Sequence, residues 1–125
     1  MEREEPPHPY AHYSAGRWFL NQVYIVGWPD IGVVKVGVTS NGRRRYGAFL
    51  NRGAEMLSLT SHKGMAFLEI EGRMHSEMEL RWPPAFESKA EAAEFLGQRG
   101  GGWLECYSIP VTEWHDVIDI LRTGE

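Results

Sequence analysis

A tyrosine, a lysine and three consecutive arginines are the first residues in the chain whose types and order suggest chemistry. Tyr24 lies in one β-branched run, Lys35 lies in the next, and Arg43, Arg44 and Arg45 follow after a short polar segment. A phenol can exchange a proton, and a guanidinium can form two parallel hydrogen bonds with a phosphate or a carboxylate. This arrangement suits the binding of an anionic partner.

A second candidate group lies further along the chain, where Glu71 and His75 are one helical turn apart. Helical periodicity places Glu71 on the apolar side of its segment, together with Phe67 and Met74. A carboxylate in that position is costly unless it is paired, hydrogen-bonded or bound to a cation. The residues alone leave two explanations open for Glu71, which are a salt bridge to Arg45 or Lys35 and a metal site.

The residues of the first group also have structural explanations. Most tyrosines on strands pack in the core, and three arginines in a row often form a solvated helix surface. At 100° per residue, Arg44 points away from the apolar side of its helix, and Arg43 and Arg45 flank it. Spacing alone does not choose between these two arginines for a functional role.

Three separated elements together resemble the GIY-YIG nuclease superfamily, over about residues 22 to 108. Gln22-Val23-Tyr24 corresponds to the first motif, Lys35-Val36-Gly37 to the second, and Arg45 to the arginine on the following helix. Gln22 replaces a glycine, and Lys35 replaces the second motif's tyrosine. A lysine there is similar to the short, phage-type branch, and Glu71-Gly72-Arg73-Met74-His75 fits the Glu-x-x-x-His pattern of that branch.

The resemblance implies a role for each matched residue. Tyr24 would be the general base, with nearby cations favouring its phenolate form. Arg45 would hold the scissile phosphate, and Glu71 would bind one Mg²⁺ or Mn²⁺ ion that neutralises the leaving oxygen. Lys35 would support Tyr24 electrostatically or contact phosphate. His75 would shuttle a proton, or alternatively orient Glu71.

Two functions follow from this resemblance. The first is a metal-dependent endonuclease that hydrolyses DNA, with substrate contacts from Arg43, Arg45 and Lys35. The alternative is a module that keeps the fold and binds nucleic acid through Arg43 and Arg45 without cleaving it. If the enzyme interpretation holds, Tyr24, Arg45 and Glu71 should converge on one solvent-open cleft, with Lys35 beside Tyr24.

The elements that must position these residues are predicted from periodicity and turn residues. They indicate an α/β (α+β) domain with a three-stranded antiparallel sheet flanked by helices, followed by a C-terminal strand and helix. Glu69 and Arg73 are expected to form an exposed pair on the second helix. The predicted strands are a hairpin at 22–39, a strand at 56–61 and a strand at 103–109. Helices are predicted at 42–52, 64–80, 88–96 and from 112 onward. The buried side of the last helix is expected to hold Val111, Trp114, Val117, Ile118 and Leu121.

Length and composition limit the class of protein. The 125 residues suit a single domain at 17–125 preceded by a mobile, proline-containing tail at 1–16. The formal net charge of −4 is unusual for a DNA-binding protein, so any DNA contact must be local, and targeting must come from loops, the tail or a protein partner. The single cysteine, Cys106, provides no disulfide framework, and no apolar stretch suggests a membrane span. A cytoplasmic location is expected.

Overall fold

The computed structural model describes residues 21–40, 43–97 and 100–123. The predicted tail at 1–16 and the first residues of the predicted domain lie outside these ranges.

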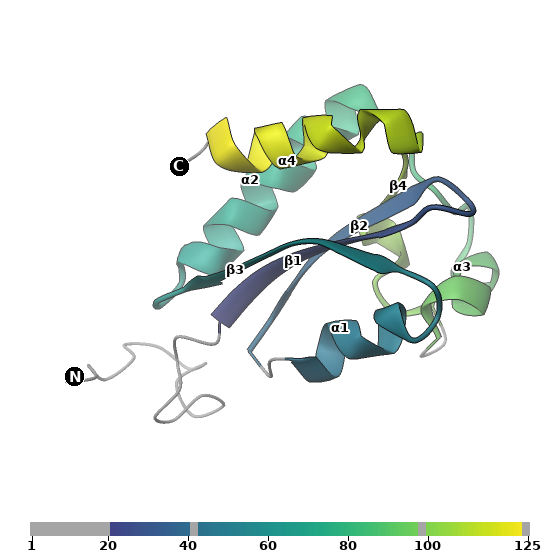
Figure 1. Cartoon of the computed structure of the whole chain (residues 1–125), viewed down its shortest axis with the longest axis horizontal. Helices are drawn as coiled ribbons and strands as arrows, with labels where there is room; N and C mark the ends of the chain where they lie inside the picture. The colour runs from purple at the N-terminus through teal and green to yellow at the C-terminus, as the bar shows by residue number, and fades with distance from the viewer. Residues whose placement is uncertain (1–20, 41–42, 98–99, 124–125) are drawn as a thin grey trace.

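A four-stranded antiparallel sheet forms the centre of the molecule (Figure 1). The strands lie in the order β3-β1-β2-β4, which confirms the predicted α/β class and adds the C-terminal strand to the sheet beside β2. β4 pairs with β2 only over Val33–Lys35. The strands are β1 (Asn21–Trp28), β2 (Val33–Thr39), β3 (Glu55–His62) and β4 (Cys106–Ser108).

The first two strands form the predicted hairpin. Its turn is closed by hydrogen bonds from the backbone N–H groups of Ile31 and Gly32 to the carbonyl of Trp28. Gly32 has a φ of +63°, which a residue with a side chain rarely adopts. The turn fixes the register, so Tyr24 lies opposite Gly37 and Val26 lies opposite Lys35.

Helices cover both faces of the sheet (Figure 1). The helices α1 (Arg43–Leu50) and α3 (Lys89–Leu96) lie on one face, and α2 (Ala66–Arg81) and α4 (Trp114–Thr123) lie on the other. Side chains alternate between the faces along each strand, as the sequence pattern predicts. Val23 and Ile25 of β1 therefore join the core under α2, while Tyr24 and Val26 join the core under α1.

The C-terminal part of the chain differs from the prediction in two places. The predicted strand at 103–109 begins instead with a 3₁₀ turn, Trp103–Glu105, and only Cys106–Ser108 are extended. A second 3₁₀ turn, Val111–Glu113, precedes α4. Because this turn does not continue the helical spacing of α4, Val111 is exposed rather than buried.

Arg73 makes a different contact from the one predicted. Its guanidinium donates to the carbonyls of Ile120 and Leu121, at 2.9 and 3.1 Å, rather than pairing with Glu69. These carbonyls belong to the last turn of α4, where the helix leaves such groups without intrahelical partners. The expected surface pair was wrong because the end of α4 packs close enough to compete for Arg73.

None of the helices in the described ranges combines the length and the apolar character that a bilayer crossing requires.

Candidate functional site

The hairpin register positions the first two motif residues. Tyr24 and Lys35 project from neighbouring strands toward α1, and the ring of Tyr24 lies over Gly37. A Cβ on Gly37 would come within 2.4 Å of the Tyr24 oxygen and 3.0 Å of Lys35 Nζ. Gly37 therefore provides the space in which the phenol and the ammonium meet.

Lys35 is the centre of the polar contacts at this site. Its side chain is fully buried, and Nζ donates to the Tyr24 oxygen at 3.1 Å and to Glu105 Oε1 at 2.7 Å. Burial by itself lowers the pKa of this amine, but the Tyr24 oxygen and the Glu105 carboxylate outweigh burial and leave the pKa raised. Lys35 is therefore a buried cation, and this burial argues against the phosphate contact expected from the sequence.

Glu105 was not identified as a site residue from the sequence. It lies 70 residues from Lys35, in the 3₁₀ turn just before β4, and no periodicity connects the two positions. The only available signal was indirect, because a lysine on a buried strand face needs an anionic partner from elsewhere in the chain. Which carboxylate fills that role depends on how β4 pairs with β2.

The second candidate pair, Glu71 and His75, lies on the opposite face of the sheet, on α2. The carboxylate Oε2 of Glu71 is 3.4 Å from Nε2 of His75, and His75 Nδ1 shares a 2.5 Å hydrogen bond with the hydroxyl of Tyr107. His75 Nε2 is buried and has no hydrogen-bond partner. Glu71 thus lies beside His75, and among the described residues it forms no ion pair with Arg45 or Lys35.

Glu105 brings the two groups together at the edge of β2. One ligand atom each from Glu71, His75 and Glu105 lie within 4.8 Å of one another. The pairing of β4 with β2 ends at Lys35, which lies opposite Cys106. Glu105 comes just before Cys106 and therefore lies at the edge of β2, where one side chain can reach both faces of the sheet. Hydrogen bonds therefore join Tyr24, Lys35 and Glu105, and Glu105 lies near Glu71 and His75, with ligand atoms within 4.8 Å but no hydrogen bond or ion pair between Glu105 and either residue.

This three-residue group suits a divalent cation. An octahedral ion with bonds of about 2.1 Å holds its ligand atoms roughly 3–4.2 Å apart, so a small closure of the group would fit one. Two carboxylates and an imidazole nitrogen without a hydrogen-bond partner provide suitable donors.

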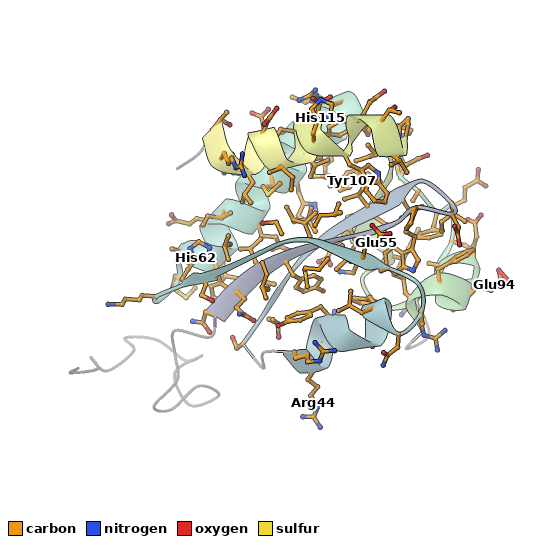
Figure 2. All side chains as sticks on the ribbon, in the orientation of Figure 1. Arg44, Glu55, His62, Glu94, Tyr107 and His115 are labelled. Carbon is orange, nitrogen blue, oxygen red and sulfur yellow. The ribbon has the colours of Figure 1, made fainter. Side chains whose placement is uncertain are left out.

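The three arginines lie on α1, away from these contacts. Arg43 and Arg44 are exposed, and Figure 2 shows Arg44 pointing away from the sheet, as predicted. Arg45 is half-buried on the flank of α1, and within the described residues it makes no hydrogen bond or ion pair. Its neighbour Tyr46 packs against Tyr24, with ring centroids 5.7 Å apart.

The expected convergence of Tyr24, Arg45 and Glu71 on one solvent-open cleft is not found. Lys35 lies beside Tyr24 as predicted, but Tyr24 is fully buried and does not open onto a cleft. Arg45 and Glu71 come from helices on opposite faces of the sheet and have no contact. The link between the two faces is Glu105.

Two further ionisable groups next to the site are held neutral. Burial raises the pKa of the Cys106 thiol to about 12, despite the opposing effect of Lys35. Burial, followed by the carboxylates of Glu79 and Glu105, also raises the pKa of Tyr107. Tyr107 therefore faces His75 as a neutral hydroxyl.

No protein-family model, curated protein or solved structure matches this chain.

Replacing Gly37 by alanine should disrupt the Tyr24–Lys35 contact. The added Cβ would displace the phenol, and we expect the free energy of unfolding to fall by about 1–3 kcal/mol, as for other overpacked cores. Gly72→Ala is the matched control, because no atom lies within 4 Å of the corresponding Cβ and alanine favours a helix by up to about 1 kcal/mol. Urea unfolding of both variants tests this; equal stability of Gly37→Ala and the wild type would contradict it.

Stability should fall as the pH rises above about 9. The unfolded chain releases the Cys106 proton near the ordinary thiol value of 9.0, whereas the folded chain keeps it up to about pH 12. The folded state therefore binds more protons in this range, and the free energy of unfolding decreases with pH. Urea titrations at pH 8 and pH 10 measure the decrease, which should be smaller in Cys106→Ala. An unchanged slope in that variant would exclude the thiol as a cause.

Proposed function

We propose that this protein is a metal-dependent endonuclease that hydrolyses phosphodiester bonds in DNA. The observation that supports this most is that hydrogen bonds link Tyr24 and Lys35 to Glu105, whose carboxylate lies within 4.8 Å of ligand atoms of Glu71 and His75. This arrangement brings the two motif residues of the hairpin close to Glu71 and His75, which come from a later segment of the chain. A DNA substrate also fits the cytoplasmic location expected from the sequence.

Arg45 is the residue proposed to hold the scissile phosphate. A guanidinium can bind two phosphate oxygens and stabilise the charge that builds up in the transition state. Arg45 suits this role because it is partly exposed and has no anionic partner in the described part of the chain. Arg43 and Arg44 add positive charge along the same helix, on a protein whose net charge is −4.

Glu71 is the residue proposed to hold one Mg²⁺ or Mn²⁺ ion, with His75 beside it. The ion would neutralise the leaving oxygen of the phosphodiester. In the same proposal Tyr24 takes the proton of the attacking water, and Lys35 stabilises the phenolate through its hydrogen bond.

Two observations favour a second candidate, a nucleic-acid-binding module that does not cleave. The first is that Arg45 and Glu71 come from helices on opposite faces of the sheet. The second is the burial of Tyr24. A general base must come within hydrogen-bonding distance of the water that it activates. Tyr24 has no exposed surface in this structure, and its oxygen already accepts a hydrogen bond from Lys35. In this alternative, Arg43 and Arg45 contact phosphate and the buried polar contacts only stabilise the fold.

Glu71→Gln should abolish DNA cleavage and leave DNA binding almost intact. Glutamine has nearly the same shape as glutamate but no charge, so it binds a divalent cation poorly. We expect the cleavage rate to fall roughly 10²-fold or more, which corresponds to several kcal/mol of lost metal stabilisation. The measurement is a cleavage time course in Mg²⁺ or Mn²⁺, paired with binding in a chelator.

Glu69→Gln is the matched control, because Glu69 is exposed on the same helix. It should cleave like the wild type. Equal cleavage by Glu71→Gln would remove the metal role of Glu71. If the wild type cleaves no form of DNA with either metal, the binding module becomes the better interpretation.

Arg45→Ala should weaken both binding and cleavage. The change removes a ground-state contact to phosphate together with a transition-state contact, and the loss of one such donor typically costs about 10²–10³ in rate. Arg44→Ala is the control of equal charge, because Arg44 points to solvent away from the sheet (Figure 2). If the two variants lose activity to the same extent, the arginines act only through their general positive charge.

A further inference from the structure

Glu105 occupies a position from which it can bind two partners. Its Oε1 accepts from the buried Lys35 ammonium at 2.7 Å, and the side chain is 36% exposed. It also lines an open pocket of about 290 Å³ together with Lys89, Gly102 and Trp103. A carboxylate has two oxygens, so the bond to Lys35 leaves Glu105 with the capacity to accept again.

On the α2 side, one ring nitrogen of His75 near Glu105 has no hydrogen-bond partner. His75 Nε2 is buried without a hydrogen bond, although it lies in the same 4.8 Å group as the carboxylates of Glu71 and Glu105. The other ring nitrogen, Nδ1, bonds to the neutral hydroxyl of Tyr107. When Nδ1–H donates to that oxygen, Nε2 presents its lone pair to the two carboxylates, which is the usual arrangement of a metal-binding histidine.

We propose that Glu105, Glu71 and His75 together form a divalent-cation site, with Lys35 holding the Glu105 carboxylate in place. This inference deepens the proposed function, on which its cleavage role rests, by adding two ligands to the one that the GIY-YIG resemblance implies. It makes Lys35 a positioning residue that connects the cation to Tyr24. Glu105 itself is open to solvent through the pocket that it lines with Gly102 and Trp103.

The donor set also indicates which ions should bind best. Mg²⁺ is held by oxygen ligands, whereas Mn²⁺ is a transition metal that suits carboxylates and can also accept an imidazole nitrogen. A site with two carboxylates and one imidazole should therefore bind Mn²⁺ more tightly than Mg²⁺. The competing explanation is that Glu105 serves only as the countercharge of Lys35 and Glu71 alone holds the metal.

The test is a titration of the full chain with Mn²⁺ in the absence of DNA. The electron paramagnetic resonance signal of the free ion measures how much Mn²⁺ is bound. Glu105→Gln should weaken Mn²⁺ binding at least about 10-fold, which is the lower limit for the loss of groups that support a metal site. Glu94→Gln is the matched control, because Glu94 is an exposed glutamate that points into solvent on α3 (Figure 2), and it should bind like the wild type.

A double variant keeps the test decisive if Glu105→Gln fails to fold when Lys35 is left unpaired. Lys35→Met with Glu105→Gln removes both partners of the pair, which is far less costly than removing one. Loss of the Lys35 charge alone would favour cation binding. Weaker Mn²⁺ binding by the double variant therefore supports Glu105 as a ligand, and binding equal to or tighter than that of the wild type overturns it.

The outcome is separable from that of the nuclease proposal. If Mn²⁺ binding depends on Glu105, Glu71 and His75 but no DNA is cleaved, the cation site stands and the enzyme does not. If the wild type binds no Mn²⁺, the cation site is excluded, whatever the cleavage assay shows.

Discussion

The buried ammonium of Lys35 is the constraint on which the site depends. Removing a charge from water costs several kcal/mol, which only close and well-oriented partners offset. Lys35 obtains these partners from Tyr24 on the neighbouring strand and from Glu105 near the C-terminal strand. Gly37 and Gly102 are required beside it, because a Cβ at either position would come within about 3 Å of the lysine side chain. One buried charge thus links the β1–β2 hairpin to the distant segment that contains Glu105.

At the edge of β2, the partner of the buried Lys35 also comes close to the proposed metal ligands. Tyr24 and Lys35 lie on the α1 face, whereas Glu71 and His75 lie on the α2 face. A sheet separates groups on its two faces everywhere except at an edge. β4 covers only the first part of β2, and Glu105 lies where that cover ends. Among the described residues, Lys35 and Glu105 lie between the proposed base and the proposed metal ligands.

The burial of Tyr24 distinguishes the nuclease from the binding module more clearly than the distribution of charge does. The chain is acidic overall, yet Arg43, Arg44 and Arg45 form a positive end of α1 without partners in the described ranges. This surface suits phosphate in both candidate functions. The burial of Tyr24 separates them, because a nuclease needs water to reach the phenol and a binding module does not.

The sequence by itself determined the local parts of this protein, and tertiary structure decided how they meet. Alternation and turn residues predicted the hairpin, and the family resemblance placed Lys35 beside Tyr24. The register that brings the two residues together is set within a few residues of the turn. Helical periodicity likewise placed Glu71 on a buried side. Glu105 and the true partners of Arg73 could not be predicted, because both depend on packing between elements that are distant in sequence. Periodicity reports only which side of an element is buried; the partner it meets there is decided by the packing of the whole chain.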